Sequence, residues 1–236
     1  MLESYSPELQ ADLAELPLAD WGNVPLVGLD MDAALANVAD AVEQAAARAL
    51  PIMIGGEHTA TLGAVRGLQR LHPGLVVMHV DAHTDLRDSY LGFEISHATF
   101  MRRVVEELGI GHLAQYGIRS GTREELELAR GCLHSGPGLD VGRNARDRIH
   151  HRPVYVTIDI DVLDPSAAPG TGCPEPGGCT FRELVAFLRS LRELNVVGVD
   201  VMEVLPAADV NDITSAAAAK LVREAALAFG LRAPRA

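Results

Sequence analysis

An apolar run passes directly into alternating acidic and histidine residues in the stretch Leu75-Val76-Val77-Met78-His79-Val80-Asp81-Ala82-His83-Thr84-Asp85. The run before Asp81 is typical of a buried strand, and alternate side chains of an extended chain point to the same side. Asp81, His83 and Asp85 can therefore converge on one point beyond the end of the strand. The stretch predicts a parallel sheet with a polar site at the carboxyl ends of its strands.

A second stretch repeats this arrangement, because the apolar run 154–158 is followed by Asp159-Ile160-Asp161. The two clusters together place four carboxylates at strand ends. Carboxylates packed together repel one another unless a cation lies among them. The alternative, caps and surface polar residues, would carry a large desolvation cost at two buried strands. The pattern therefore predicts a metal site, with two ions.

Three further residues are candidates for the same site. His58 follows the turn Gly55-Gly56 at a third strand end, and an imidazole among carboxylates suits Mn, Zn or Fe. His97 lies before a helix, where it either serves helix entry or transfers protons as a partly exposed imidazole. Glu203 ends another strand and can hold a planar cation through two parallel hydrogen bonds. His79, inside an apolar strand, is expected to be a core histidine with satisfied hydrogen bonds.

Apolar strands alternate with amphipathic helices along the chain. Strands are expected over 24–29, 52–54, 75–80, 113–118, 154–159 and 195–201, and helices over 6–17, 32–50, 59–71, 98–108, 123–130, 181–194 and 214–229. This order predicts one α/β domain, residues 1–236, with a mainly parallel sheet covered by helices on both faces, a three-layer α/β/α arrangement. The Gly- and Pro-rich loop 164–179 is expected to line the site.

Composition excludes several classes of function. The net charge of −12 argues against nucleic acid as a partner and is compatible with a cationic substrate. No run of about 18 uncharged apolar residues is present, which argues against a membrane span. The three cysteines, Cys132, Cys173 and Cys179, do not form a disulfide framework, so a reducing cytoplasm fits best.

Several segments together resemble one known family, the ureohydrolases, which comprises arginases and agmatinases. The resemblance rests on Gly55-Gly56-Glu57-His58-Thr59, Asp81-Ala82-His83-Thr84-Asp85, Ser96-His97-Ala98, Tyr116-Gly117-Ile118-Arg119-Ser120, Asp159-Ile160-Asp161-Val162-Leu163-Asp164-Pro165, the loop 168–178 and the segment 200–206. It covers nearly the whole chain and implies the fold shared by arginases and deacetylases.

The resemblance also implies an activity and a set of roles. The activity is that of a binuclear manganese hydrolase, with two Mn²⁺ per subunit, which cleaves a guanidino group to an amine and urea. One ion would be held by His58, Asp81, Asp85 and Asp159, and the other by Asp81, His83, Asp159 and Asp161. Asp85 would take part in proton transfer, His97 would relay a proton to the leaving amine, and Glu203 would orient the guanidinium; His97 and Glu203 would contact the substrate. Family resemblance further suggests a homo-oligomer, a trimer or hexamer.

The choice of substrate stays open at this point. Arginases carry an Asn two residues after the third motif ligand, where this chain has Arg87, and the following run 88–92 is more similar to agmatinases. Agmatine, converted to putrescine, is therefore the preferred substrate. Arg87 would suit an acid such as guanidinobutyrate if it faced the pocket, and arginine is a further alternative. A catalytically idle metal-binding homologue is the remaining hypothesis.

One departure from the family concerns the start of the chain. Family members usually begin with a strand that lies inside the sheet, upstream of the segment Tyr5-Ser6-Pro7-Glu8-Leu9. Without that strand, buried backbone groups would be unpaired. We therefore expect either a misassigned start site or a shortened relative, which the intact mass of the native protein would distinguish.

Overall fold

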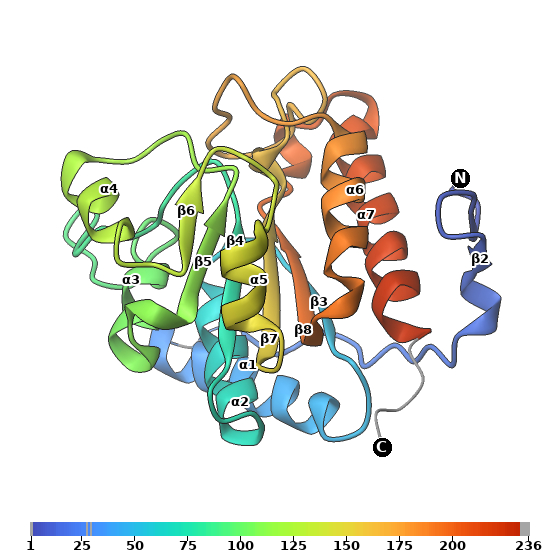
Figure 1. Ribbon diagram of the computed structural model, residues 1–236, viewed down its shortest axis with the longest axis horizontal. Helices are drawn as coiled ribbons and strands as arrows, with labels where there is room; N and C mark the ends of the chain where they lie inside the picture. Colours follow the sequence, from blue (N-terminus) through green and yellow to red (C-terminus); the bar gives the residue numbers. More distant parts are fainter. Residues whose placement is uncertain (1, 27, 29, 232–236) are drawn as a thin grey trace.

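A parallel sheet forms the centre of the computed structural model, which describes residues 2–26, 28 and 30–231 (Figure 1). In these residues the sheet has six strands in the order β3-β8-β7-β4-β5-β6, and every neighbouring pair is parallel. The strands are β3 (Ile52–Ile54), β4 (Val76–Val80), β5 (Leu113–Tyr116), β6 (His134–Gly136), β7 (Pro153–Asp159) and β8 (Asn195–Met202). β4 and β7, the strands that precede the two acidic clusters, are neighbours. The two clusters therefore end side by side.

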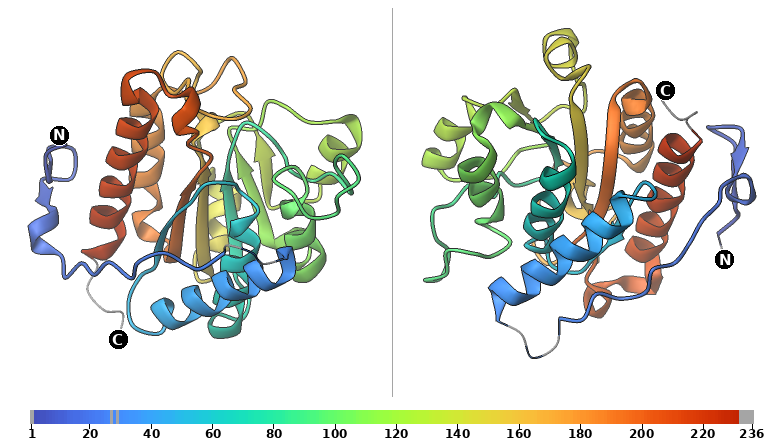
Figure 2. Two further views of the ribbon diagram at one scale, coloured as in Figure 1. Left: turned by 180° about the vertical axis from the view of Figure 1, so that it is seen from behind. Right: turned by 90° about the horizontal axis from the view of Figure 1, so that it is seen from below.

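Helices cover both faces of the sheet (Figures 1 and 2). One apolar cluster packs a face against α1 (Met31–Ala46), α2 (Ala60–Leu71), α3 (Phe100–Leu108) and α4 (Arg123–Ala129). The other packs the opposite face against α5 (Arg143–Ile149), α6 (Phe181–Ser190) and α7 (Ile213–Gly230). β4 shows the alternation directly, because Val76 and Met78 belong to one cluster and Val77 to the other. The predicted three-layer α/β/α fold is confirmed.

The local signals in the sequence explain where several elements begin. Thr180 caps α6 through a reciprocal pair of hydrogen bonds with Glu183, at the start of the helix that the sequence predicted over 181–194. Thr122 and Glu125 form the same arrangement at α4. All five residues of β4 are buried, in agreement with its continuous apolar run.

Two predicted elements are wrong. The expected helix over 6–17 is instead a short antiparallel pair, β1 (Tyr5–Ser6) and β2 (Ala11–Asp12), followed by the 3₁₀ turn η1 (Leu13–Glu15). Ser6 is buried and its hydroxyl donates to Oε2 of Glu224 in α7 at 2.8 Å, so a long-range contact overrides the local helical pattern. The expected strand over 24–29 is absent over 24–26, while residues 27 and 29 lie outside the described residues.

Two elements were not predicted because their sequences lack the expected signals. β6 has no apolar side chain, and α5 is short and rich in arginine. At the opposite side of the sheet, β3 pairs only with β8 among the described strands. Its last residue, Ile54, is 72% exposed. β3 is therefore an edge strand among the described strands.

Candidate metal centre and active site

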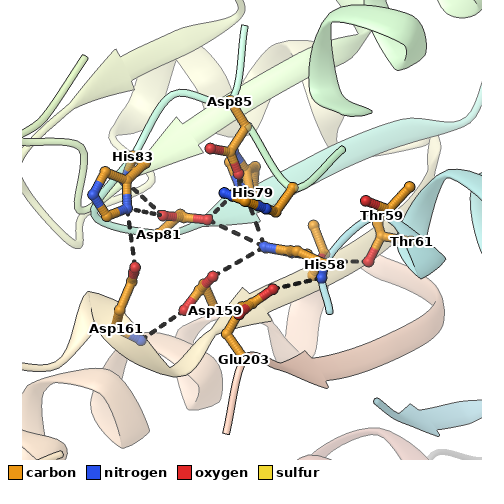
Figure 3. A network of polar contacts seen from close by, with 12 residues as sticks. His58, Thr59, Thr61, His79, Asp81, His83, Asp85, Asp159, Asp161 and Glu203 are labelled. Atoms are coloured by element: carbon orange, nitrogen blue, oxygen red, sulfur yellow. Dashed lines mark hydrogen bonds and ion pairs between the residues drawn. The ribbon is translucent and has the colours of Figure 1, made fainter. Parts of the chain in front are cut away.

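The six residues predicted as metal ligands lie together at the carboxyl ends of the strands (Figure 3). His58 follows β3, Asp81, His83 and Asp85 follow β4, and Asp159 and Asp161 come from the end of β7 and the turn after it. Nδ1 of His58 lies 3.1 Å from Oδ2 of Asp159, 3.3 Å from Oδ2 of Asp81 and 3.9 Å from Oδ2 of Asp85. Nδ1 of His83 lies 2.9 Å from Oδ2 of Asp161 and 3.5 Å from Oδ1 of Asp81.

These contacts divide the cluster into two halves that share Asp81. The inner half contains His58 and Asp85, which face Oδ2 of Asp81, and the outer half contains His83 and Asp161, of which His83 faces Oδ1 of Asp81. The side chain of His58 has no exposed surface, whereas that of His83 is 26% exposed. His58 is thus closed off from solvent, whereas Asp85, His83 and Asp161 border the cavity.

Partners behind the inner half fix the orientation of His58. Its Nε2 lies 2.7 Å from Oγ1 of Thr157, beside the hydroxyl of Thr61, which donates to Asp200 at 2.7 Å. Because Asp200 accepts hydrogen bonds from this hydroxyl network, Thr157 can accept the Nε2 proton of His58. Nδ1 then carries the lone pair that faces the carboxylates, which is the arrangement a metal-binding imidazole needs.

His79 is buried beside the same carboxylates, but its hydrogen bonds assign it a different role. Gln115 donates to the carbonyl oxygen of Thr84 at 2.8 Å, which identifies its amide nitrogen, and the same nitrogen lies 3.0 Å from Nδ1 of His79. Nδ1 therefore accepts, and the proton of the neutral ring is on Nε2, which donates to Oδ2 of Asp81 at 2.8 Å. Burial lowers the pKa of His79, in keeping with a neutral ring. His79 positions Asp81, a contact that its place in an apolar strand did not reveal.

The electrostatics of the cluster suit divalent cations. Burial, reinforced by the neighbouring charge of Asp81, raises the pKa of Asp85 well above its usual value, and burial with the charge of Asp161 does the same for Asp159. Burial opposes the charged form of His83, but Asp161 and Asp81 outweigh it and raise its pKa to about 11. Four buried carboxylates with two imidazoles form a donor set that matches two divalent ions in charge and in ligand type. The residues present therefore fit a metal centre.

Glu203 and His97 both line this cavity. Oε1 of Glu203 accepts the backbone N–H of His58 at 2.7 Å, which anchors the carboxylate beside the inner half. His97 is on the outside, with Nδ1 3.5 Å from Oε1 of Glu57 and its ring edge against Tyr90. Asp85 and Glu203 both have positive φ, 53° and 67°. Such backbone strain in residues other than glycine is concentrated at functional sites.

The cavity also contains residues that the sequence did not single out. Its wall is formed by His83, Thr84, Asp85, Arg87, Tyr90, His97, Ala98, Ser120, Gly121, Thr122, Glu125, Asp159, Asp161, Cys173 and Glu203. Glu125 is buried and accepts from Thr84 and from the N–H of Leu86. The only sequence feature that distinguishes Glu125 is its position in the capping pattern of α4. Cys173 confirms that the loop 164–179 lines the site.

Comparison with known proteins places the chain in a family. The model of the Arginase family matches residues 1–228, so the chain belongs to the arginase family. It is 40% identical over 234 residues to the agmatinase of Bacillus anthracis, with 97% of this chain and 81% of the relative covered. It is 40% identical over 230 residues to the N(1)-aminopropylagmatine ureohydrolase of Thermococcus kodakarensis, with 94% and 77% covered.

A solved structure agrees with these relatives. The proclavaminate amidinohydrolase of Streptomyces clavuligerus superposes with a TM-score of 0.87 at 32% identity, with 98% of this chain and 81% of that chain covered. The protein is accordingly an enzyme of the ureohydrolase and amidinohydrolase type. Among the described helices, none combines the length and apolar character that crossing a bilayer requires.

Proposed function

We propose that this enzyme is a binuclear manganese hydrolase that cleaves agmatine to putrescine and urea. The observation that carries the proposal is the pair of ligand groups that share Asp81, opening into a cavity that also contains Glu203 and His97. The agmatinase relatives support the choice of substrate. Residues 1–236 act as one domain, because loops from both halves of the sheet build the site.

The proposed role of each residue follows from its position in the site. Bound divalent cations would supply a water of lowered pKa as the nucleophile near neutral pH. His58, Asp81, Asp85 and Asp159 would hold the inner ion, and Asp81, His83, Asp159 and Asp161 the outer one. Glu203, fixed by the N–H of His58, would pair with the planar guanidinium.

Proton transfer would run from the buried side of the cavity to the exposed side. Asp85 is 8% exposed and lies among the carboxylates, where it can hold the proton released by water. His97, whose side chain is 42% exposed, would deliver a proton to the leaving amine, and its contact with Tyr90 orients its ring toward the cavity.

Two further properties belong to this proposal. The free cysteines Cys132, Cys173 and Cys179 support a reducing, cytoplasmic environment. A homo-oligomer, a trimer or hexamer, is expected from the family.

A second candidate is a guanidino acid such as guanidinobutyrate. Arg87 lines the cavity, with its guanidinium 5.1 Å from the ring centre of Tyr90. Nε of Arg87 also lies 3.5 Å from Oε2 of Glu125, which offsets part of its charge. A relative named for proclavaminate, a carboxylate, supports the same candidate.

Urea release by Mn²⁺-loaded enzyme from agmatine, arginine and guanidinobutyrate separates these functions. We expect agmatine to give the highest kcat/KM and Asp161→Ala to abolish release. Guanidinobutyrate as the best substrate, with that preference lost in Arg87→Gln, would favour the second candidate. Binding of two Mn²⁺ without urea release from any of the three would indicate a catalytically idle homologue.

A further inference from the structure

Arg119 is a half-buried cation whose side chain donates its hydrogen bonds to backbone carbonyl groups. Within the described residues its guanidinium donates to the carbonyl oxygens of Gly117, Asp161, Val162, Leu163 and Glu175. The two shortest contacts, both 2.7 Å from Nη2, are to Asp161 and Glu175. No carboxylate appears among these partners.

The carbonyl groups that Arg119 binds belong to segments that build the outer half of the metal centre. Asp161 is a ligand of that half, and Glu175 lies in the same loop as Cys173, which lines the cavity. The backbone N–H of Arg119 donates to the carbonyl of Ala82 at 2.8 Å, and the N–H of Ala82 donates to Oδ1 of Asp161 at 3.1 Å. Arg119 thus ties the segment that carries His83 to the segment that carries Asp161.

Close packing leaves Arg119 little freedom to bind elsewhere. Gly117, two residues before it, has φ of +87°, and a Cβ atom there would lie 2.5 Å from Cγ2 of Val162 and 2.9 Å from the carbonyl oxygen of Asp81. This close approach holds the turn after β5 against both metal-binding segments. Only a planar fork of several donors can then reach carbonyl groups on different segments at once.

The inner half is held by other residues. His58 is oriented by Thr157 and by Glu203, and the carbonyl oxygen of Asp85 accepts the N–H of Arg102. None of the hydrogen bonds of Arg119 described above reaches His58 or Asp85. The ligands that the two halves do not share therefore have separate supports.

From this geometry we infer that Arg119 is a positioning residue for the outer metal ion alone, acting through the backbone of Asp161. The inference rests on the proposed binuclear centre. Removal of the guanidinium frees the turn 161–163 and the loop at Glu175, so His83 and Asp161 lose their alignment while His58 and Asp85 keep theirs. Loss of a partner behind a metal ligand costs about 10–100-fold in metal affinity.

Titration of metal-free full-length protein with Mn²⁺, by calorimetry and by electron paramagnetic resonance, tests this inference. The variants are Arg119→Met and Arg119→Lys, which retains the charge without the fork. Arg66→Met is a matched control, because Arg66 pairs with Glu107 at the surface. We expect one site to keep its affinity and the other to weaken by about 10–100-fold in both Arg119 variants. At limiting Mn²⁺ the spectrum should change from an exchange-coupled pair to an isolated ion.

Three results would overturn the inference while the proposed function stands: two sites of wild-type affinity, equal weakening of both sites, or loss of folding in both Arg119 variants by circular dichroism. The last two would show that Arg119 supports the fold as a whole. A wild-type protein that binds fewer than two Mn²⁺ would instead contradict the proposed function, on which the inference depends.

Discussion

The inner and outer halves of the proposed metal centre contain the same chemical groups but lie in different surroundings. His58 is fully buried, and its Nε2 contacts a hydroxyl network that leads to Asp200, whereas His83 borders the cavity and contacts Asp161. Burial raises the cost of any unpaired charge, so the inner ligands must be more completely paired. The difference indicates that His58 belongs to the core of the protein, whereas His83 belongs to the wall of the cavity.

Removal of the shared carboxylate should have the largest effect. Asp81→Ala removes the residue that faces both histidines, so we expect loss of both metal ions and a fall in kcat of at least about 10⁴-fold. Asp161→Ala should remove only the outer ion. Metal content by mass spectrometry, with Asp40→Ala on the surface as control, checks this contrast. Equal metal loss in the Asp81 and Asp161 variants would contradict the division into halves.

His97 provides a test of a residue that belongs to neither half. We expect His97→Asn to lower kcat by about 10²–10⁴-fold, the usual contribution of a general acid, with metal content unchanged. Steady-state kinetics with agmatine and metal analysis of the same samples measure both quantities. Loss of metal in this variant would show that His97 supports the centre instead of the proton transfer.

Replacement of His58 and replacement of His83 should lower the stability of the metal-free protein by different amounts. In metal-free protein, His58→Asn leaves buried partners without hydrogen bonds, so we expect the free energy of unfolding to fall by about 1–3 kcal/mol. His83→Asn should cost less, because its side chain is partly exposed. Urea denaturation in the presence of chelator measures both. A larger loss for His83→Asn would reverse the assignment of inner and outer halves.

His79 offers a finer test of the inner half. Because His79 donates to Asp81, the variant His79→Gln should weaken Mn²⁺ binding by about 10–100-fold without changing the number of ions bound. Calorimetric titration provides both the affinity and the stoichiometry. Loss of one ion would identify His79 as a ligand.

The smallest expected effect is the pH dependence of the stability of the metal-free protein. The folded pKa of His83 is raised to about 11 from 6.5, so its contribution to stability is complete below pH 6.5 and is lost as the pH rises toward 11. Metal binding needs the neutral ring and strengthens over the same range. The difference in Tm between Mn²⁺-loaded and chelated protein should therefore increase from pH 6 to pH 8.5. This increase should be reduced in His83→Asn.

The sequence predicted five of the six described strands of the sheet and all six candidate ligands, because both depend on local patterns. Apolar runs such as 75–80 identify buried strands, and period-two spacing identifies the side chains that converge. Neither pattern predicts the order of the strands in the sheet. The prediction of the site did not need that order, because it required only that the carboxyl ends of the strands meet at one edge of the sheet.

What the sequence did not predict depends on long-range contacts. The contact of His79 with Asp81 requires knowledge of Gln115, which comes from the neighbouring strand. The N-terminal segment forms a β pair because Ser6 is buried against Glu224, more than 200 residues away in the chain. The proposed role of Arg119 cannot be predicted from the neighbouring sequence, since its principal partners are backbone carbonyl groups, which any residue could supply.

The left-handed backbone at Asp85 and Glu203 has a consequence for how this enzyme can evolve. A residue other than glycine in that conformation costs about 1–2 kcal/mol. Glycine at position 85 would relieve this strain and remove a buried carboxylate, so we expect the chain to fold more easily without the proposed catalytic group. Selection for thermostability alone would therefore favour loss of the proposed proton-transfer group at this position.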